Sequence, residues 1–293
     1  VGRPNVGKST LLNKIVGEKI AIVSKIPQTT RNQIRGVYND ERGQIVFIDT
    51  PGFHFETDNL DRCMNDAVTS TIDGVDCLIY LVDPTRRLGK EEDNIAAKIK
   101  DARVPLILGL NKADMKSGRP DVYIEFLEKV MGKPVQEMEK VSLVALSGEK
   151  GLNVDKLIDV IFEYLPEGPP LYDTDTITDL PQKMAVADII REKFLQTLRQ
   201  ELPHAIGIFI EQMRPIKGSM YVKALVYVET SSQKEIIIGK GGQNLKSVGT
   251  QARADLEELL EQKVFLEFFV KCNKHWRDDI NILQELGYNQ SMM

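Results

Sequence analysis

The sequence opens, after Val1, on Gly2-Arg3-Pro4-Asn5-Val6-Gly7-Lys8-Ser9, which matches the P-loop pattern G-x-x-x-x-G-K-[ST]. In such a loop the glycines allow successive backbone N–H groups to converge on phosphate oxygens, and the following helix N-terminus adds partial positive charge. We expect residues 2–10, with Thr10 in the helix, to bind the phosphates of a nucleotide. Lys8 would contact the β- and γ-phosphates, and Ser9 would bind Mg²⁺.

Two later motifs each follow an apolar run that is typical of a buried strand. Asp49-Thr50-Pro51-Gly52 follows residues 45–48, and Asn111-Lys112-Ala113-Asp114 follows residues 104–110. Because an open parallel sheet binds ligands at the loops after its strands, the three motifs should meet around one nucleotide. Asp49 offers a carboxylate to Mg²⁺, and the N–H of Gly52 can meet a γ-phosphate. The three motifs in this order predict a GTPase.

Asp114 is the residue expected to select guanine. Its carboxylate can accept hydrogen bonds from guanine N1–H and from the N2 amine, whereas adenine would leave it unpaired. A missing partner of this kind can discriminate by roughly 10⁴. We therefore expect residues 111–114 to form the guanine site.

Two polar segments are expected to act as switches. Residues 18–32 lack a clear period and contain Gln28-Thr29-Thr30-Arg31, whose hydroxyls can complete the Mg²⁺ shell when a γ-phosphate is bound. Thr30 is the first choice for this role and Thr29 the second. The second switch would comprise Asp49-Thr50-Pro51-Gly52-Phe53 and the polar residues that follow, as far as Asn59.

The composition excludes several classes of protein. Hydrophobic residues make up 42% and charged residues 28%, and the net charge of −5 argues against a wholly basic nucleic-acid binder. Residues 1–182 carry 23 Lys+Arg against 29 Asp+Glu, whereas residues 183–293 carry 15 against 14. Three scattered cysteines show no metal or redox spacing and fit a reducing cytosol. No apolar run could span a bilayer, and no signal-peptide pattern is present.

A length of 293 residues suggests two domains. Residues 1–165 alternate strand and helix patterns in the way that builds a doubly wound α/β sheet. Residues 166–182, rich in Pro, Asp and Thr, are expected to form a linker. Residues 183–293 predict the order α-β-β-α-α-β, an α+β domain with a C-terminal tail. Most of the strand expected before the P-loop is missing, which predicts a truncated N-terminus.

The loop Gly239-Lys240-Gly241-Gly242 lies between two expected helices and satisfies G-x-x-G. KH domains use this arrangement to clamp about four nucleotides of a single strand. The glycines allow phosphates to approach the backbone, and Lys240 adds charge. Residues 214–253 contain seven basic residues and two acidic ones, a local charge of +5. We therefore expect RNA to bind here, with Lys246 contributing from the second helix.

Together these features resemble the Era family of ribosome-assembly GTPases, over essentially the whole chain. The wording that carries the resemblance is Gly-Arg-Pro-Asn-Val-Gly-Lys-Ser-Thr at 2–10, Pro-Gln-Thr-Thr-Arg at 27–31, Asp-Thr-Pro-Gly-Phe-His at 49–54, Asn-Lys-Ala-Asp at 111–114, Leu-Pro-Glu-Gly-Pro-Pro at 165–170 and Ile-Ile-Arg-Glu-Lys at 189–193. The resemblance implies a GTPase domain followed by a KH domain.

The resemblance also implies a function and cofactors. It implies a GTP-hydrolysing factor that binds the 3′ end of small-subunit ribosomal RNA during maturation of the small ribosomal subunit, in the cytoplasm and sometimes at the inner membrane surface. GTP or GDP and Mg²⁺ would be the cofactors, and DNA would not be a partner. Asn5 stands where related GTPases use an Asn to hold a monovalent cation, which implies K⁺.

Two positions depart from the patterns of related GTPases. Phe53 stands where Ras-like enzymes place a water-orienting Gln after D-x-x-G, and a phenyl ring cannot hydrogen-bond water. The loop that contacts guanine, Ser-Ala-Leu in relatives, reads Val144-Ala145-Leu146 here. The N–H of Ala145 can still meet guanine O6, with Leu146 beside it, but the serine hydroxyl is lost.

Two alternative functions stay open. Phe53 favours a GTP-gated RNA-binding scaffold in which hydrolysis is incidental. The other alternative is a membrane-associated regulatory GTPase, against which stand the missing lipid-anchor motif and the lack of a basic amphipathic helix.

Overall fold

The computed structural model describes residues 1–24, 26, 29–52, 56–198 and 205–288. By their internal contacts the residues divide into two compact units. The first consists of Val1–Ala21, Thr30–Glu56 and Met64–Asp179, and the second of Ile22–Thr29, Thr57–Cys63 and Leu180–Met293. The limits expected for the two domains and the linker stay predictions, because the units are defined by contacts alone.

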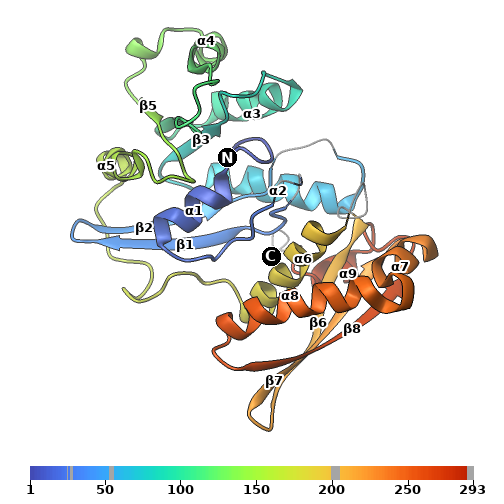
Figure 1. Ribbon diagram of the computed structural model, residues 1–293. Coiled ribbons are helices and arrows are strands. Elements are labelled where there is room, and N and C mark those ends of the chain that lie inside the picture. Colours follow the sequence, from blue (N-terminus) through green and yellow to red (C-terminus); the bar gives the residue numbers. More distant parts are fainter. Residues whose placement is uncertain (25, 27–28, 53–55, 199–204, 289–293) are drawn as a thin grey trace. The chain divides into compact units, whose positions relative to one another are not determined.

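The first unit alternates helices and strands, as the sequence predicts (Figure 1). Its elements are α1 (Lys8–Val16), β1 (Ile34–Asp40), β2 (Gly43–Asp49), α2 (Asn59–Asp73, whose first residues group with the second unit), β3 (Leu78–Val82), α3 (Lys90–Asp101), β4 (Leu106–Leu110), α4 (Pro120–Met131), the short 3-10 helix η1 (Val135–Glu137), β5 (Val141–Ala145) and α5 (Val154–Tyr164).

The strands β3, β4 and β5 form a parallel sheet in that order, and β1 and β2 form the expected antiparallel hairpin. All five residues of β4 are buried, as a strand covered on both faces requires. One face of the parallel sheet packs against α1 and α5, and the other packs against α2, α3 and α4. The prediction of a doubly wound α/β fold is confirmed.

The segment after α5 packs along the β1–β2 hairpin. The N–H of Val37 donates to the carbonyl of Ile177 over 2.8 Å, and Gly36 pairs with Thr178 as an antiparallel bridge. Gln44 accepts the backbone N–H groups of residues 171 and 172 on its side-chain oxygen. The part of the expected linker up to residue 179 is therefore held on β1 and β2, a contact that its irregular sequence did not indicate.

The second unit has the predicted order α-β-β-α-α-β. Its elements are α6 (Gln182–Thr197), β6 (Gly207–Ile216), β7 (Ser219–Val228), α7 (Ser231–Ile238), the 3-10 turn η3 (Lys240–Gly242), α8 (Gln243–Leu259), β8 (Lys263–Cys272) and α9 (Ile280–Glu285). The sequence analysis did not predict α9, which begins where the carboxylate of Asp279 accepts the N–H groups of Asn281 and Ile282.

The sheet of this unit has the order β6-β7-β8, antiparallel and then parallel. Alternate residues of β7, beginning with Val222 and ending with Val228, pack with α6, α7 and α8 in one apolar core. Helices therefore cover one face of this sheet, as expected of an α+β domain. Within the described ranges, no helix is both long enough and apolar enough to cross a lipid bilayer.

Candidate nucleotide-binding site

Three positions of the P-loop have a positive φ angle, namely Gly2 (154°), Asn5 (62°) and Gly7 (102°). A Cβ atom on Gly2 would lie 2.3 Å from the carbonyl oxygen of Leu81, and one on Gly7 would lie 2.4 Å from Nδ2 of Asn111. Sterics and backbone conformation therefore both require glycine at these two positions. The loop leads directly into α1, whose first residues are Lys8 and Ser9.

The three residues predicted to bind Mg²⁺ converge. The hydroxyl of Ser9 lies 2.6 Å from Oδ2 of Asp49 and 2.8 Å from the hydroxyl of Thr30. The Thr29 hydroxyl instead donates to the carbonyl of Ile26 over 2.6 Å. Of the two threonines, the structure brings Thr30, the first choice, to this group.

An oxygen of Asp49 is available for a cation. Its Oδ1 atom is buried and has no hydrogen-bond partner among the residues that the structure describes. Burial raises the pKa of Asp49, and the nearby Lys8 ammonium and Ser9 hydroxyl oppose that shift. A carboxylate and two hydroxyls are the hard oxygen ligands that Mg²⁺ prefers. The donor set therefore fits this ion, which when bound would neutralise phosphate charge.

Lys8 extends across the P-loop. Its ammonium donates to the carbonyl oxygens of Gly2 and Arg3, each over 3.0 Å. Burial lowers the pKa of Lys8, whereas the charge of Asp49 raises it. The ammonium therefore already lies in the loop where phosphates are expected.

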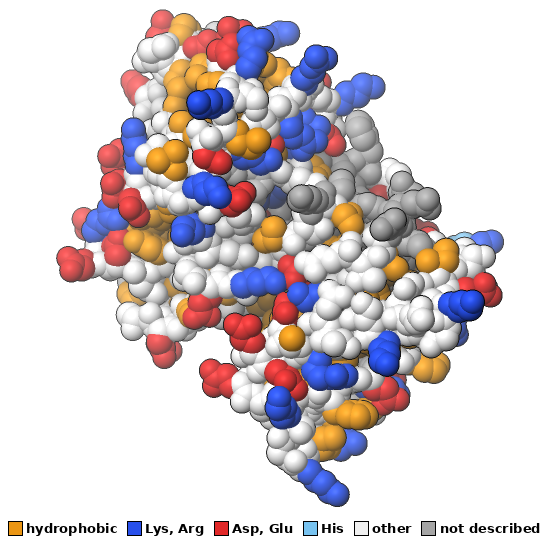
Figure 2. Space-filling model, viewed as in Figure 1, with side chains coloured by type: hydrophobic (Ala, Val, Ile, Leu, Met, Phe, Trp, Pro, Cys, Tyr) orange, Lys and Arg blue, Asp and Glu red, His pale blue; other side chains and the backbone are white. Residues whose placement is uncertain are grey.

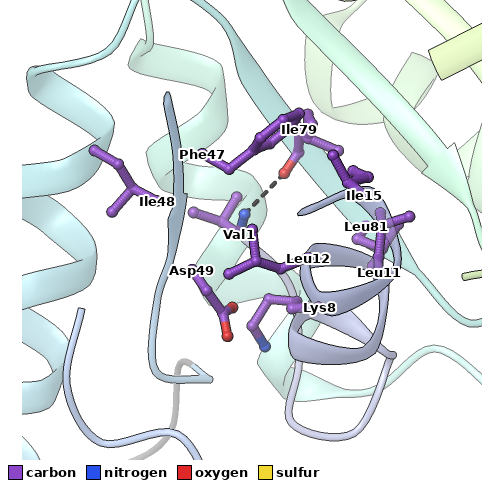
Figure 3. A pocket seen from close by; sticks show the side chains of 10 residues that line it. All are labelled: Val1, Lys8, Leu11, Leu12, Ile15, Phe47, Ile48, Asp49, Ile79 and Leu81. Atoms are coloured by element: carbon purple, nitrogen blue, oxygen red, sulfur yellow. Dashed lines mark hydrogen bonds between the residues drawn. The ribbon is translucent and has the colours of Figure 1, made fainter. Parts of the chain in front are cut away.

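Behind the P-loop, α1, β2 and β3 line a partly open cavity of about 70 Å³ (Figure 3). Most of its lining is aliphatic, and the polar groups of Lys8 and Asp49 reach it from one side. The cavity is far smaller than the roughly 300–1,000 Å³ of typical ligand pockets. It therefore belongs to the apolar core beside the phosphate site and not to the nucleotide site itself.

Asn111 connects the P-loop to the loop after β5. Its side chain is buried, donates to the carbonyl of Val6 over 2.7 Å and accepts the N–H of Gly148 over 2.9 Å. The sequence analysis assigned Asn111 to guanine. The structure shows that both ends of its amide hold protein loops together, so it positions the phosphate and base loops relative to each other.

Lys112 and Asp114 differ in their surroundings. The ammonium of Lys112 lies 2.5 Å from Oδ2 of Asp83, at the end of β3. Burial favours a raised pKa for Asp83, but hydrogen bonds from Lys112 and Thr85 outweigh burial and lower that pKa. Asp114 is exposed, as a residue that must meet a ligand has to be in the free protein. Its role in reading guanine stays a prediction.

The loop after β5 contributes less than the sequence suggested. Leu146 is fully buried, and its N–H already donates to the carbonyl of Leu110 over 2.9 Å. Its carbonyl accepts the N–H of Ala113, which ties this loop to the Asn-Lys-Ala-Asp motif. Ala145 is exposed and remains the residue of this pair that can approach a base.

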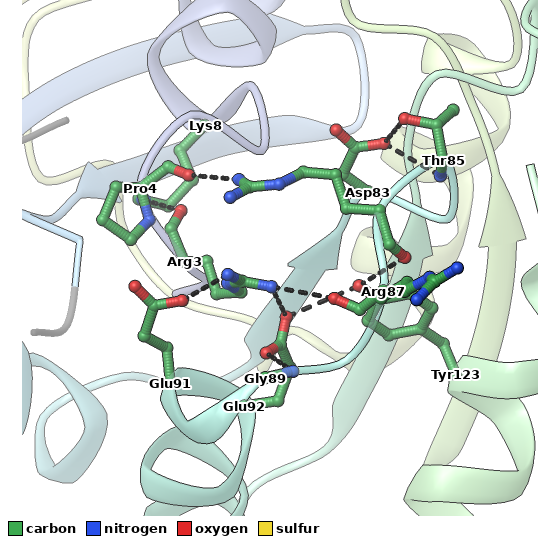
Figure 4. A network of polar contacts seen from close by, with 11 residues as sticks. Arg3, Pro4, Lys8, Asp83, Thr85, Arg87, Gly89, Glu91, Glu92 and Tyr123 are labelled. Atoms are coloured by element: carbon green, nitrogen blue, oxygen red, sulfur yellow. Dashed lines mark hydrogen bonds and ion pairs between the residues drawn. The ribbon is translucent and has the colours of Figure 1, made fainter. Parts of the chain in front are cut away.

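A polar network holds the P-loop to the start of α3 (Figure 4). The guanidinium of Arg3 pairs with Glu91 and with Glu92, the latter over 2.9 Å, and donates to the carbonyl of Arg87. Glu92 is buried and also accepts the N–H of Gly89 over 2.8 Å. The side chain of Arg3, a predicted phosphate ligand, thus points to α3, and the phosphate contact expected there can come only from its backbone.

We expect Glu92→Gln to weaken both the fold and nucleotide binding. The amide keeps the shape of Glu92 but removes the charge that faces Arg3, and one buried hydrogen-bonded charge is worth about 1–3 kcal/mol of unfolding free energy. Affinity for GDP should fall with it, because the P-loop loses an anchor. Urea unfolding and GDP titration measure the two effects.

Glu91→Gln is the matched control, since Glu91 binds the same guanidinium but its side chain is 32% exposed, against 1% for Glu92. Its cost should stay below about 1 kcal/mol. Equal effects of the two substitutions would show that burial of Glu92 does not anchor the P-loop.

Gly52, the predicted γ-phosphate donor, lies against the P-loop. A Cβ atom there would come within 2.7 Å of Pro4 Cγ and 2.8 Å of the Pro4 nitrogen. The motif glycine is therefore required for close approach to the loop that binds phosphate. Phe53, expected in place of a water-orienting Gln, lies outside the described residues.

The loop predicted to bind RNA has a backbone in conformations that favour glycine. Gly239, Gly241 and Gly242 have φ angles of 73°, 61° and 77°, and a Cβ atom on either of the last two would meet no atom within 4 Å. Lys240 and Lys246 are exposed. The side chain of Asn244, which the sequence analysis missed, donates to the carbonyl of Ile236 over 2.7 Å and so links the two helices.

The face in Figure 2 shows basic and acidic side chains interspersed, in keeping with a local and not a general positive charge. The backbone of Gly241 and Gly242 is open to an approaching phosphate. The structure therefore provides the loop geometry that the sequence predicted, and the individual RNA contacts stay predictions.

Each of the two units matches the model of a known protein family. Residues 1–112 match the family model of 50S ribosome-binding GTPases, and residues 201–277 match that of KH domains. The structure of a point variant of Aquifex aeolicus Era bound to GDP and AlF4⁻ has 35% identity, a TM-score of 0.89, and coverage of 98% of this chain and 96% of that one. The chain belongs to the Era family.

A second Era structure agrees with this assignment. It contains Era with MgGDPNP and nucleotides 1506–1542 of 16S ribosomal RNA, and it has a TM-score of 0.90, 35% identity and the same coverage of 98% and 96%. The predicted family and the order of a GTPase domain before a KH domain are confirmed. For this Era-family protein the residues Ser9, Thr30 and Asp49 form the candidate Mg²⁺ site.

Proposed function

We propose that this protein hydrolyses GTP and binds the 3′ end of small-subunit ribosomal RNA in maturation of the small ribosomal subunit. The observation that carries the proposal is that one chain combines a P-loop whose Ser9, Thr30 and Asp49 converge with an open G-x-x-G loop. It is similar along its whole length to Era proteins solved with GDP and AlF4⁻ and with MgGDPNP and 16S ribosomal RNA.

The residues of the first unit suit phosphoryl transfer to water. Such catalysis consists almost entirely of positioning and charge stabilisation. Lys8 supplies a partly buried positive charge within the P-loop, and Gly52 lies beside Pro4 of that loop. Mg²⁺ supplies further positive charge when bound. Asn111 and Glu92 keep the loops in place around these groups.

We expect Gly242→Asp to abolish binding of a single-stranded RNA of about four nucleotides, the length that the loop clamps, and to leave GTP affinity unchanged. The new carboxylate would face a phosphate, and its bulk would block close approach of the backbone. Asp tolerates a positive φ and is a favourable residue before a helix, so the fold should persist. Fluorescence anisotropy with a labelled rRNA 3′-end oligonucleotide measures the loss.

Gly132→Asp serves as the matched control. Gly132 has a φ of 73°, close to the 77° of Gly242, and its Cβ would likewise meet nothing within 4 Å, but it follows α4 in the first unit. This variant should bind RNA as the wild type does. Binding of the four-nucleotide RNA that survives in Gly242→Asp would contradict the role of the G-x-x-G loop.

RNA affinity is expected to differ between the GTP and GDP states by about 5- to 150-fold, the usual range of such coupling. The basis is the segment up to residue 179, which precedes the second unit and is bonded to β1. Arg35 of β1 pairs with Asp179 over 2.8 Å, and β1 begins four residues after Thr30. Ordering of Thr30 on a γ-phosphate would thus shift β1, the strand to which the segment ending at residue 179 is bonded.

Titration of the RNA with GDP and with a non-hydrolysable GTP analogue tests the coupling, and Arg35→Ala should reduce the ratio of the two affinities. The control is Arg42→Ala, because Arg42 lies on the same hairpin and is 44% exposed, as Arg35 is, but pairs with Asp40 and Asp159. Identical RNA affinities in both nucleotide states would leave two independent modules.

The cytoplasm is the compartment in which we place this activity, because ribosomal RNA is found there; peripheral association with the membrane stays an alternative, tested by liposome flotation. Single-turnover hydrolysis with and without RNA distinguishes an RNA-dependent GTPase from the scaffold alternative, in which hydrolysis is incidental.

The K⁺ role of Asn5 is a further proposal. Comparison of the hydrolysis rates in potassium chloride and sodium chloride at equal ionic strength would test it.

A further inference from the structure

The sheet of the second unit has a face that its helices α6, α7 and α8 do not cover. Because side chains alternate along a strand, the residues of β7 between those of the core point to this other face, beginning with Tyr221 and ending with Tyr227. The register places residues of β6 and β8 beside them: Arg214 and Phe265 at Tyr221, Phe209 and Phe269 at Leu225, and Gly207 and Lys271 at Tyr227.

One end of this face is closed by the segment after β8. Trp276 is fully buried and stacks on Tyr227 with ring centroids 6.4 Å apart. A Cβ atom on Gly207 would come within 2.9 Å of the indole and 3.1 Å of Leu286. The absence of a side chain at Gly207 therefore leaves room for Trp276 and Leu286 on this face.

The other end carries rings that are open to solvent. Tyr221 and Phe265 stack across the strands with centroids 5.9 Å apart and an angle of 19° between their planes. The guanidinium of Arg214 lies 5.0 Å from the Tyr221 ring on the opposite side. Phe265 is 58% exposed and Phe269 is 57% exposed. We call Arg214, Tyr221, Phe265 and Phe269 the open aromatic face.

The charges around the open aromatic face favour an anionic partner. On these strands and the turn between β6 and β7 the basic side chains are Arg214, Lys217, Lys223, Lys263 and Lys271, and the acidic ones pointing to the same face are Glu211 and Glu267. Lys223 pairs with Glu211 over 2.6 Å, Lys263 pairs with Glu257 of α8 over 3.1 Å, and Glu267 accepts the Tyr221 hydroxyl, so the positive surplus comes from Arg214, Lys217 and Lys271. An exposed ring, a planar guanidinium and a cationic surround are the groups that bind unstacked bases and their phosphates.

We propose that the open aromatic face is a second binding site for single-stranded RNA, on which bases stack against Phe265 and Phe269. The proposal rests on the RNA-binding function proposed above and extends it beyond the G-x-x-G loop. A protein partner would use the apolar area of the two rings but would not need the stacked guanidinium or the surplus of lysines.

The two RNA sites lie at different ends of the domain. The G-x-x-G loop precedes α8, whose 17 residues span about 25 Å, and β8 begins four residues after α8 ends. Phe265 therefore lies near the far end of α8 from the loop and on the opposite face of the sheet. An RNA of about four nucleotides can occupy the loop alone, whereas an RNA of about 20 nucleotides can reach both sites.

The test compares these two RNA lengths on the full chain in which Phe265→Leu and Phe269→Leu are combined. Leucine keeps apolar area but lacks an aromatic plane. Affinity for the long RNA should fall about tenfold or more, since each stacked base is worth about 5- to 150-fold. Affinity for the short RNA should be unchanged. Ile280→Ala, at a 53% exposed apolar residue of α9, is the control and should change neither.

A second variant, Phe265→Trp, reports stacking directly. The native Trp276 is buried, so quenching of the new, exposed indole by the long RNA reports a base on this face. Quenching should persist when Gly242→Asp is added, although at higher RNA concentration. Suppose that the short RNA still binds. Unchanged long-RNA affinity in the leucine variant, together with an unquenched indole, would then overturn the second site.

Other outcomes distinguish the remaining explanations. If the wild type bound neither RNA, the proposed function itself would fail. If the leucine variant kept its RNA affinity but lost binding to a purified ribosomal protein of the small subunit, the face would be a protein-docking surface and the RNA proposal would be wrong. Self-association that the leucine variant loses, with RNA affinity intact, would assign the face to a second copy of the chain.

Discussion

Replacing Lys8 by alanine is expected to reduce GTP hydrolysis by a factor of about 10²–10³ or more, as loss of one charge-stabilising donor does in other enzymes. The Lys8 ammonium lies within the P-loop, on the carbonyls of Gly2 and Arg3, with Asp49 nearby. Phosphate release from GTP under single-turnover conditions measures the effect.

Lys14→Ala provides the control for this prediction. Lys14 is in the last turn of the same helix, α1, and is exposed. It should hydrolyse GTP at the wild-type rate. If Lys8→Ala retained that rate as well, the P-loop assignment would be wrong.

Ser9→Ala should lower hydrolysis through Mg²⁺. The hydroxyl of Ser9 is the atom that both Asp49 and Thr30 contact, so its loss breaks the donor set at its centre. This variant should require more Mg²⁺ for half-maximal activity, whereas Lys8→Ala should not be restored by added Mg²⁺. The contrast separates loss of a metal ligand from loss of a phosphate contact.

The sequence predicted those parts of the site that short motifs encode. A run such as Gly7-Lys8-Ser9 specifies a backbone shape, because glycine alone permits the required φ, and the shape then determines what the next side chains reach. Apolar runs before Asp49 and before Asn111 indicated strands, and parallel strands bring the loops that follow them to one edge. The convergence of Ser9 with Asp49 follows from these local rules.

Contacts between distant side chains could not be predicted in the same way. Glu92 stands among three acidic residues in the first turn of α3, where any of them suits the helix dipole, and only the fold shows that Glu92 is the buried partner of Arg3. Asn111 looks like a base contact in its motif, yet its amide joins Val6 to Gly148. In both cases the partners meet only in the folded protein, and no fixed spacing in the sequence indicates the contact.

The same distinction between local patterns and long-range contacts applies to secondary structure outside the motifs. The pattern of β7 and β8 indicated strands, but it did not show which of their apolar residues stay exposed, since Phe265 and Val264 are equally apolar neighbours. The segment at residues 171–179 lacks periodicity because its structure comes from hydrogen bonds to β1 and β2 and not from burial of one face. Long-range pairing alone gives it a fixed place.

Asp114→Asn is expected to exchange the preference for guanine nucleotides for one for xanthine nucleotides. The carboxylate accepts from both N1–H and the N2 amine of guanine, whereas the asparagine amide can accept from N1–H and donate to the carbonyl that xanthine carries at C2. A mismatch leaves a polar group without a partner, which can cost a factor of up to about 10⁴ in discrimination. Displacement of a fluorescent GDP analogue by GDP and by xanthosine diphosphate measures the preference.

The exposed position of Asp114 makes this test clean, because the substitution breaks no contact that the fold needs. Asp121→Asn, at another exposed carboxylate in the first turn of α4, should leave guanine preference intact. Two features of the site should also survive in Asp114→Asn: the bridge from Asn111 to Val6 and the group of Ser9, Thr30 and Asp49. Hydrolysis of xanthosine triphosphate should therefore approach the wild-type rate with GTP. A variant that still bound GDP as tightly as the wild type and ignored xanthosine diphosphate would show that another residue reads the base.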